Sequence, residues 1–508
     1  MQPSIRYLTP DEIARLDPTG KARAKLASYV DSKPTPTPAP FSHLSREQWL
    51  QNARAIRNSI KGKRWDEYKS WDESLESKYG AQGGTFSVSY LHESYSRSYE
   101  FAKKTRKFKL ACIGRDFLLA LISDSVRKVG YPSPIPAYIG TTGTSSGLPV
   151  MGRKGSFLPE TVGMSHWRHV IPDLPGERFQ RQKRRCINMD ANSNVRYIEE
   201  YLARVRSFLR SYLKEFASWR RPDEVEQPAI YYCLSHGYAA VGFDYDHCDE
   251  SFSLETSIEI VLPIYEFLLS PMEFARLASC VEELFHQEIF FGSYCMTGLH
   301  NLLSGEVITN DFETIYDICV GLGVLLTTVG YENGLVMANG DDVLIFVKRS
   351  LKLLQQVRDA YINEALQNGM IMSAEKCDIY DTGHVKYLRR FYCNYPTLYN
   401  SYGQPYSLGA YPIVLTYNSI FCPERFAKSD AEIMQSTLQR LDNQFGGPAF
   451  STIVGSVLSQ WKVPLPQMEE VASLTAFDWW MRLYGTSWDL KTSNAYKTAV
   501  RLKLLPQV

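Results

Sequence analysis

Apolar residues recur along this chain with two kinds of spacing, which predict a mixture of helices and strands. Repeats of three and four positions, typical of a helix with one buried face, occur in residues 46–59, 65–79, 195–219, 311–330 and 351–368. Short apolar runs of strand length occur at residues 239–243, 335–338 and 343–347. Both kinds of element therefore contribute to the predicted fold.

Linker and turn residues divide the chain into parts. The Pro/Thr-rich residues 33–40 predict an extended linker on a surface, and residues 80–85 form a glycine-rich break. Residues 395–508 have a mixed helical pattern and no cluster suited to catalysis. The sequence contains no internal repeat.

The composition is that of a globular protein. The 508 residues predict about three structural units. The hydrophobic share of 44% and charged share of 22% exclude a disordered chain, a collagen and a coiled coil. The ten cysteines stand singly, without zinc-ligand spacing, so we expect reduced thiols in an intracellular protein. The longest apolar run, residues 319–329, is shorter than the roughly 20 residues of a membrane span, so we expect no such span.

Charge changes this picture only where it is clustered. Lys+Arg number 56 and Asp+Glu 55, so the formal net charge is +1, which argues against a wholly basic nucleic-acid coat protein. Five of the seven residues 103–109 and five of the eight residues 178–185 are basic. Each run is either a solvated face or part of a groove that binds nucleic acid. The 32 tyrosines include candidates for stacking on nucleobases.

Two acidic clusters are the strongest candidates for chemistry. Asp244 directly follows the apolar run 239–243 and is therefore expected at the end of a strand. The Asn-Gly dipeptide at 339–340 separates two apolar runs, which is a strong hairpin signal. This hairpin is expected to place Asp341 and Asp342 at a tight turn.

Carboxylates at a strand end and at a hairpin tip can share Mg²⁺. This ion prefers oxygen ligands and binds through few carboxylates plus substrate phosphates. Two such ions about 4 Å apart stabilise both the attacking and the leaving oxygen of a phosphoryl transfer. However, Asp-Asp is also ordinary turn chemistry, and Gly-Asp-Asp arises by chance in about one chain in ten of this size. The tripeptide alone therefore does not establish a metal site.

Seven stretches, in the same order, resemble the motifs of the viral RNA-dependent RNA polymerases. Individually they are weak or moderate signals, but their correct order makes a strong case, and the region from the first to the last spans about half of the chain, residues 144–391. They are residues 144–154 (motif G), 182–187 (motif F), 244–249 (motif A), 304–309 (motif B), 340–342 (motif C), 369–376 (motif D) and 385–391 (motif E). Within this family the chain resembles the polymerases of small bisegmented double-stranded RNA viruses, picobirnaviruses first and partitiviruses second.

The resemblance implies an α+β right-hand fold of fingers, palm and thumb, closed by an N-terminal bridge between fingers and thumb. It implies template-directed transfer of nucleotides from nucleoside triphosphates to an RNA 3′-OH, with initiation that needs no primer. The expected divisions are residues 1–75 (bridge), 76–238 (mainly fingers), 239–394 (palm, with a fingers insertion around 262–298) and 395–508 (thumb).

The family's catalytic residues carry over position by position. Asp244 and Asp341 are expected to ligate two Mg²⁺ ions, with Mn²⁺ as an alternative ion. Asp342 is expected to support the site or to contact a metal. Lys376 is expected to protonate the leaving pyrophosphate, with a role at a helix end as the open alternative.

The resemblance also assigns residues to the substrates. Cationic side chains match phosphate oxygens, so Lys183 and Arg185 are expected to hold the triphosphate. The further expected nucleotide contacts are Asp249, Ser304, Gly305 and Thr309. The expected RNA contacts are Ser145, Ser146, Gly147, Lys103, Lys104, Arg106, Lys107, Arg389 and Arg390.

One position departs from the family pattern and leaves alternatives open. Many relatives have an Asn four residues after the motif B Thr, which helps to recognise the ribose 2′-OH, whereas this chain has Glu313 there. Asn310, which directly follows the motif B residue Thr309, is a candidate substitute for the missing Asn. Two other functions also stay open. One is a reverse transcriptase, although Asn339 stands where those enzymes usually have Tyr. The other is an inactive RNA-binding or capsid-associated protein with the same fold.

The resemblance further implies partners and a location. The expected partners are RNA template and product and the four nucleoside triphosphates, with a viral capsid protein as a candidate. The protein would replicate and transcribe a viral genome in the host cytoplasm and inside the virion.

Overall fold

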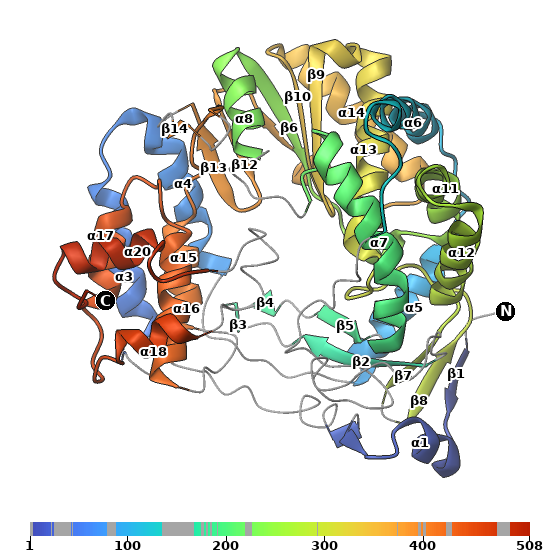
Figure 1. Ribbon diagram of the computed structural model, residues 1–508, viewed down its shortest axis with the longest axis horizontal. Helices are drawn as coiled ribbons and strands as arrows, with labels where there is room; N and C mark the ends of the chain where they lie inside the picture. The colour runs from blue at the N-terminus through green and yellow to red at the C-terminus, as the bar shows by residue number, and fades with distance from the viewer. Residues whose placement is uncertain are drawn as a thin grey trace.

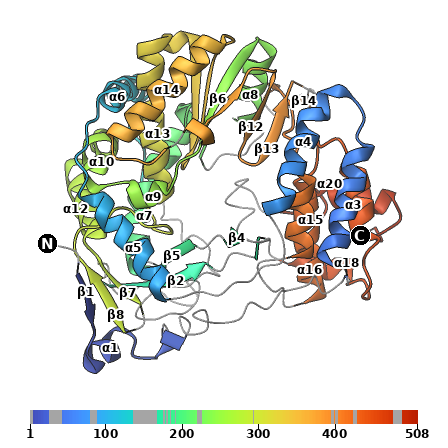
Figure 2. The same ribbon diagram turned by 180° about the vertical axis from the view of Figure 1, so that it is seen from behind.

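The helices and strands follow one another round a ring, with the C-terminal helices on one side and strands β1, β7 and β8 on the other (Figures 1 and 2). The computed structural model describes, for some residues by their backbone alone, residues 4–21, 23–24, 42, 44–78, 88–134, 167–173, 177–178, 181–182, 185–189, 192–218, 226–291, 293–372, 374–394, 398–399, 403–422, 429–474 and 488–507. Within this part of the chain, no helix is long and apolar enough to span a bilayer.

A four-stranded antiparallel sheet occupies one side of the ring. Its strands, in spatial order, are β11 (Asp378–Tyr380), β6 (Tyr238–Phe243), β10 (Asp342–Lys348) and β9 (Gly334–Asn339). Successive side chains of a strand point to opposite faces, so Val343 and Ile345 enter one hydrophobic core while Leu344 and Phe346 enter another. Burial of both faces explains why these strands are apolar throughout and do not alternate.

Helices and a hairpin cover the two faces of this sheet. One face packs against α13 (Thr309–Thr328), α14 (Leu351–Gln367) and, beyond them, α6 (Leu110–Val129). The other packs against α8 (Glu226–Ser235) and the hairpin of β12 (His384–Tyr387) and β13 (Arg390–Cys393). Figure 1 shows α8 and α13 on opposite sides of β6, β9 and β10.

Two glycines allow α6 and α13 to lie in unusually close contact. A Cβ atom on Gly114 of α6 would lie 1.7 Å from the backbone oxygen of Cys319, and one on Gly323 of α13 would lie 2.0 Å from the backbone oxygen of Leu110. No side chain fits at such distances, so the two helices pack backbone against backbone at both positions. α13 is thereby held between α6 and the sheet.

A second sheet stands on the opposite side of the ring. Its five strands, in spatial order, are β1 (Ser4–Tyr7), β8 (Tyr294–Thr297), β7 (Glu288–Phe291), β2 (Trp167–Asp173) and β5 (Arg185–Met189). Around it lie α5 (Val88–Ala102), α7 (Asn192–Tyr212), α11 (Leu262–Leu268) and α12 (Pro271–Phe285). The start of the chain therefore completes a sheet whose other strands come from residues 167–297.

The C-terminal helices share a core with helices from the N-terminal part of the chain. The Tyr68 hydroxyl donates to the backbone oxygen of Tyr411 at 2.8 Å. The backbone N–H of Val414 donates to Asp72 at 3.0 Å, and Arg57 pairs with the same buried carboxylate at 3.1 Å. The helices are α3 (Arg46–Ser59), α4 (Asp66–Ser74), α15 (Ile413–Phe421), α16 (Asp430–Asp442), α17 (Phe450–Leu458), α18 (Met468–Ser473) and α20 (Asn494–Arg501).

The structure confirms most predicted elements and corrects one boundary. The helix over residues 46–59 and the three strands are found where the pattern predicts them. The helix predicted over 195–219 instead ends at Tyr212. The reason is that residues 213–218 run beside β9, where the N–H of Ala217 donates to Ala338 and the N–H of Ala338 donates to Glu215. Buried backbone groups need partners, and here a strand supplies them.

Gly114→Ala should strongly destabilise the protein, because the new methyl group would overlap the backbone of α13. We expect a loss of at least about 2 kcal/mol in the free energy of unfolding, in the range known for overpacked cores, measured by chemical denaturation. Gly455→Ala is the matched control, because its Cβ would meet only Leu502 at an ordinary 3.6 Å. Equal stabilities of the two variants would contradict the close contact of α6 and α13.

Candidate active site

Two aspartates from different strands lie opposite each other at one edge of the four-stranded sheet. β6 and β10 pair so that Phe243 faces Val343. Continuing this antiparallel register by one position sets Asp244 opposite Asp342. Both side chains are exposed, so the sheet ends in a pair of neighbouring carboxylates that reach solvent.

A two-residue turn adds a third aspartate to this edge. Asn339 pairs with Asp342, so Gly340 and Asp341 form the turn, and the φ angle of +60° at Gly340 is one that glycine adopts without strain. The N–H of Gly340 donates to Oγ1 of Thr314 on α13 at 2.7 Å. The predicted hairpin is thus confirmed, with Asp342 as the first residue of β10 and not part of the turn.

The carboxylates at this edge repel one another. The surrounding protein, followed by the charges of Asp341 and Asp244, raises the pKa of Asp342, and the guanidinium of Arg389 opposes the rise. Asp342 is still open to solvent on its outer side, so water screens part of this repulsion. Burial together with the Asp341 carboxylate also raises the pKa of Glu313.

The three aspartates suit Mg²⁺ in the kind of donor that they offer. They present carboxylate oxygens only, and a divalent cation would offset the repulsion that, after burial, contributes to the raised pKa of Asp342. Across the described ranges, however, no three His, Cys, Asp or Glu side chains are already arranged so that they could hold a metal ion. Asp244, Asp341 and Asp342 as metal ligands therefore remain a prediction.

Three buried polar side chains form a hydrogen-bonded group in the core next to this edge. Asp317 of α13 accepts hydrogen bonds from the hydroxyls of Tyr245 at 2.6 Å and Tyr361 at 2.8 Å. The two hydroxyls lie 2.9 Å apart, and burial raises the pKa of Asp317 well above its usual range. Since Tyr245 directly follows Asp244, this group fixes the backbone that carries the first aspartate.

Lys376 lies beside the same strand end. It closes the short helix η6 (Ala374–Lys376), and its ammonium group forms an ion pair with Asp246. The N–H of Asp246 also donates to the backbone oxygen of Ile371 at 2.9 Å. The structure therefore brings the predicted proton donor to the segment that begins with Asp244.

The predicted nucleotide contacts of motifs A and B lie on adjoining segments. Asp249 is in the short helix α9 (Cys248–Ser251). The loop with Ser304 and Gly305 is joined to the end of α9 by a hydrogen bond from the N–H of Leu302 to the backbone oxygen of Phe252, at 2.8 Å. That loop leads into α13, whose first residue is Thr309. These predicted contacts therefore come from segments that are hydrogen-bonded to each other.

Comparison with solved structures finds a similar overall fold in two viral enzymes. The crystal structure of the RNA-dependent RNA polymerase of a human picobirnavirus matches with a TM-score of 0.72 and 15% sequence identity, covering 90% of each chain. Its insertion-loop deletion mutant matches with a TM-score of 0.71 and 14% identity, covering 90% of this chain and 93% of that one. The chain has the fold of these viral polymerases. No protein-family model and no curated protein matches the sequence.

In this polymerase fold, Glu313 occupies the position of the motif B departure and is buried beside the other two motifs. It lies near Cys248 of α9, and the carboxylates of Asp341 and Asp249 contribute to its raised pKa. Asn310 and Glu313 both face the Gly340 turn, because a Cβ on Gly340 would lie 3.1 Å from the Asn310 amide nitrogen and 3.7 Å from a Glu313 carboxylate oxygen. Of the two candidates, Glu313 is the one linked by its charge interactions to Asp249.

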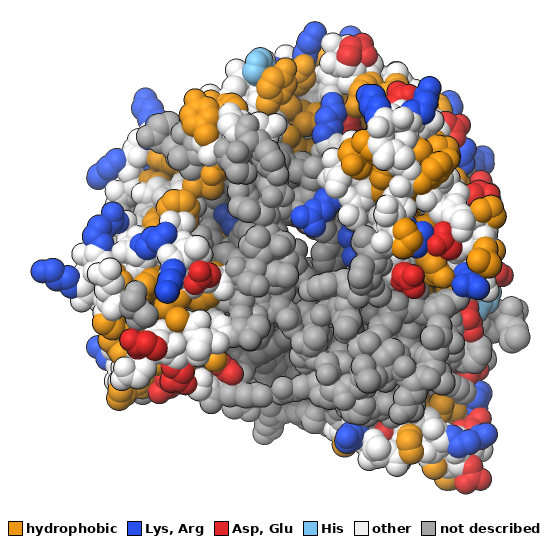
Figure 3. Space-filling model, viewed as in Figure 1, with side chains coloured by type: hydrophobic (Ala, Val, Ile, Leu, Met, Phe, Trp, Pro, Cys, Tyr) orange, Lys and Arg blue, Asp and Glu red, His pale blue; other side chains and the backbone are white. Residues whose placement is uncertain are grey.

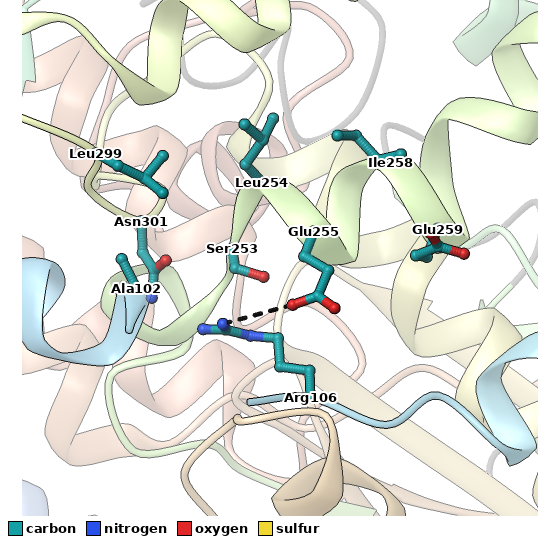
Figure 4. A pocket seen from close by; sticks show the side chains of 9 residues that line it. All are labelled: Ala102, Arg106, Ser253, Leu254, Glu255, Ile258, Glu259, Leu299 and Asn301. Carbon is teal, nitrogen blue, oxygen red and sulfur yellow. Dashed lines mark ion pairs between the residues drawn. The ribbon is translucent and has the colours of Figure 1, made fainter. Parts of the chain in front are cut away.

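The basic run at 103–109 contains one residue, Arg106, that is buried inside the protein. Arg106 is buried, and its guanidinium donates to the backbone oxygens of Lys104 at 2.8 Å and Phe101 at 2.7 Å. Arg106 lines a pocket of about 280 Å³ and pairs with Glu255 at 4.0 Å, and Figure 4 shows this ion pair at the pocket wall. Its side chain is only 1% exposed, so this structure gives no support to the expected RNA contact of Arg106, which stays a prediction.

The neighbouring lysines are placed differently from Arg106. Lys103, Lys104 and Lys107 are exposed. Lys103 pairs with Glu100 at 2.9 Å, and Lys104 lies 4.4 Å from the centre of the Phe101 ring. Their contacts with RNA remain a prediction.

The two arginines of motif E have different surroundings. Leu388 and Arg389 form the turn between β12 and β13, with φ angles of +47° and +59°, and Arg389 is exposed beside the Asp342 carboxylate. Arg390 instead donates to the backbone oxygens of Gly409 and Asn443, both at 3.0 Å. Arg390 thus joins this hairpin to the C-terminal helices, while Arg389 faces the candidate site.

Several predicted residues fall outside the part of the chain that the structure describes. They are Ser145, Ser146, Gly147 and Lys183. For Arg185 the backbone lies in β5, and its side chain is outside the described part.

Sequence patterns did not indicate Tyr245, Asp317 and Tyr361 as a group. Asp317 sits inside an apolar helical stretch where a charged residue is expensive to bury, and this is the one signal that could have drawn attention to it. Its partners come from positions 72 and 44 residues away.

Tyr361→Phe should lower the stability of the protein, because it removes a hydroxyl donor from the buried Asp317. We expect a loss of about 1–3 kcal/mol in the free energy of unfolding, measured by chemical denaturation. Tyr131→Phe is the control, since Tyr131 is 63% exposed and its hydroxyl should contribute less than about 0.5 kcal/mol. A Tyr361→Phe variant as stable as the control would contradict the role of this group.

Proposed function

We propose that this protein is an RNA-dependent RNA polymerase that copies RNA from an RNA template. One observation supports this most strongly: Asp244, Asp341 and Asp342 meet at one edge of a sheet inside a fold shared with viral polymerases over 90% of the chain. As part of the same proposal, the enzyme replicates and transcribes a viral genome, in the host cytoplasm and in the virion, and starts without a primer.

As part of this proposal, we assign the right-hand subdivisions to the two sheets and the C-terminal helices. The four-stranded sheet with α13 and α14 would be the palm. The five-stranded sheet with α5 and α7 would belong to the fingers, and α15 to α20 with α3 and α4 to the thumb. Because β1 joins the fingers sheet while α3 and α4 join the thumb core, the N-terminal part of the chain is suited to the proposed bridge.

The proposed reaction is attack of an RNA 3′-OH on the α-phosphate of a nucleoside triphosphate, with release of pyrophosphate. Asp244 and Asp341 would hold Mg²⁺, with Asp342 in support, and the ion would supply the positive charge that phosphoryl transfer needs. Asp249, Ser304 and Thr309 would orient the nucleotide beside them. Positioning of this kind can account for a large share of the rate enhancement.

Lys376 would donate a proton to the departing pyrophosphate. Its ammonium group is held by Asp246, and this ion pair keeps the donor next to Asp244 before the nucleotide arrives. Desolvation lowers the pKa of Lys376, but the hydrogen bond to Asp246 and the charge of Asp244 raise it to a net upward shift. The lysine is therefore charged and able to donate at neutral pH.

Asp341→Ala should abolish template-dependent RNA synthesis, with a loss of more than about 100-fold, because it removes a proposed Mg²⁺ ligand without disturbing the core. RNA synthesis on a defined single-stranded template, with and without Mg²⁺, measures this loss. Asp124→Ala is the control, since Asp124 is an exposed carboxylate of α6 paired with Arg127. The control should retain the wild-type rate.

Three results would overturn the proposal. RNA synthesis that survives Asp341→Ala would exclude the catalytic assignment. RNA binding without any synthesis by the wild type would favour an inactive protein with a polymerase fold. Preference for deoxyribonucleotides would favour a reverse transcriptase.

Lys376→Met should lower kcat for single-nucleotide incorporation by roughly 100-fold, the usual contribution of a general acid, with little change in KM. Lys376→Arg keeps the charge and the pairing with Asp246, and it should retain more activity than Lys376→Met. Equal kcat values for Lys376→Met and the wild type would show that Lys376 is not the proton donor.

A further inference from the structure

Helix α5 contacts both segments that carry the predicted nucleotide contacts of motifs A and B. Its residue Arg97 makes a two-point ion pair with Glu250 of α9: Nε lies 2.9 Å from Oε2, and one terminal nitrogen lies 3.2 Å from Oε1. The Glu250 side chain is 13% exposed and the Arg97 side chain 34%. Two parallel hydrogen bonds of this kind restrict orientation as well as distance.

The next residue of α5 binds the motif B side. The hydroxyl of Ser98, which is fully buried, accepts from the N–H of Asn301 at 3.0 Å and donates to the Asn301 backbone oxygen at 3.4 Å. Asn301 stands three residues before Ser304. Consecutive residues of one helix therefore hold α9 and the loop that leads to Ser304.

The two segments are also bonded to each other. The Asn301 side-chain amide donates to the backbone oxygen of Glu250 at 3.0 Å, and the N–H of Leu302 donates to the backbone oxygen of Phe252 at 2.8 Å. α5, α9 and the loop therefore form a closed triangle of contacts. We therefore expect a change in α5 to shift α9 and the loop that leads to Ser304 relative to each other.

Glu250 connects this triangle to Asp249. The N–H of Glu250 donates to the Asp249 carboxylate at 2.9 Å, and α9 is only four residues long, too short to hold its own position by helical hydrogen bonds. His247, whose φ angle is +54°, approaches Glu250 with its ring Nδ1 at 3.4 Å. What holds Glu250 therefore contributes to the orientation of Asp249, and Arg97 holds Glu250 by two hydrogen bonds of 2.9 and 3.2 Å.

We propose that Arg97 is a positioning residue for the incoming nucleotide. By holding Glu250, it sets the separation between Asp249 and the Ser304–Gly305 turn, and so determines how tightly the enzyme holds the nucleoside triphosphate. This inference rests on the proposed polymerase function. Arg97 is paired with Glu250 and not with one of the proposed metal ligands, so the proposal places its effect in the binding of the nucleotide and not in the chemical step.

Arg97→Ala should raise the KM for nucleoside triphosphates by about tenfold and change kcat by less than about threefold. Arg97→Lys keeps the charge but loses the two-point geometry, and its KM should fall between those of the wild type and Arg97→Ala. Single-nucleotide incorporation on a preformed RNA primer–template measures both constants. The affinity for the primer–template and the midpoint of thermal unfolding are measured in parallel.

A charge exchange distinguishes positioning from general support of the fold. Arg97→Glu and Glu250→Arg alone place like charges together and should raise KM, while the double variant restores the pair and should recover most of the loss. Arg127→Ala is the matched control, because it breaks an exposed ion pair with Asp124 on α6. Its KM should equal that of the wild type.

The outcomes separate this inference from the proposed function. A wild-type protein that incorporates no nucleotide contradicts the polymerase function itself. An active wild type with an unchanged KM in Arg97→Ala, or with equal losses in kcat and RNA affinity, overturns the positioning role alone. If Arg97→Ala does not fold, the KM values of Arg97→Lys and of the charge-exchange variants test the positioning role instead. A double variant whose KM is not lower than those of the single variants also overturns the positioning role.

Discussion

The pairing of β6 with β10 is the interaction on which the candidate site depends. A slip of one residue in a strand moves every side chain to the opposite face, so Val343 and Leu344 could not both keep their present cores. The two cores therefore fix the register, and the register sets Asp244 opposite Asp342. α13 adds the second constraint, because Thr314 holds the Gly340 turn while Gly114 and Gly323 hold α13 itself against α6.

This arrangement gathers negative charge that the fold must stabilise by other means. Burial, followed by the charges of neighbouring carboxylates, raises the pKa values of Asp342, Glu313 and Asp317. The ionised form of each of these side chains is therefore unfavourable in this site. Local conflicts of this kind occur where function requires them. The hydroxyls of Tyr245 and Tyr361 donate hydrogen bonds to one carboxylate oxygen of Asp317. The close packing of α6 against α13 on the same face of the sheet adds stability that the carboxylates do not provide.

The sequence alone predicted those structural features that a local pattern of residues determines. An Asn-Gly between two apolar runs predicted the hairpin, and an apolar run before Asp244 predicted its strand end, because both signals lie within about ten residues. Contacts between distant residues had no such signature. The packing of α4 on α15 through Asp72, the strand β1 beside β8, and the hydrogen bonds of Asp317 to Tyr245 and Tyr361 depend on tertiary neighbours that a single sequence does not reveal.

Arg97 and Arg106 show why the number of basic residues in a run is a poor guide to their role. Arg106 belongs to a basic run, yet it is buried and donates to backbone oxygens. Arg97 stands outside any run, yet it pairs with the residue next to Asp249. On the face that Figure 3 shows, the described Lys, Arg, Asp and Glu side chains are likewise interspersed, in keeping with the net charge of +1. The electrostatics of this chain are therefore made by individual pairs, and each cation has to be judged by its partner and its burial.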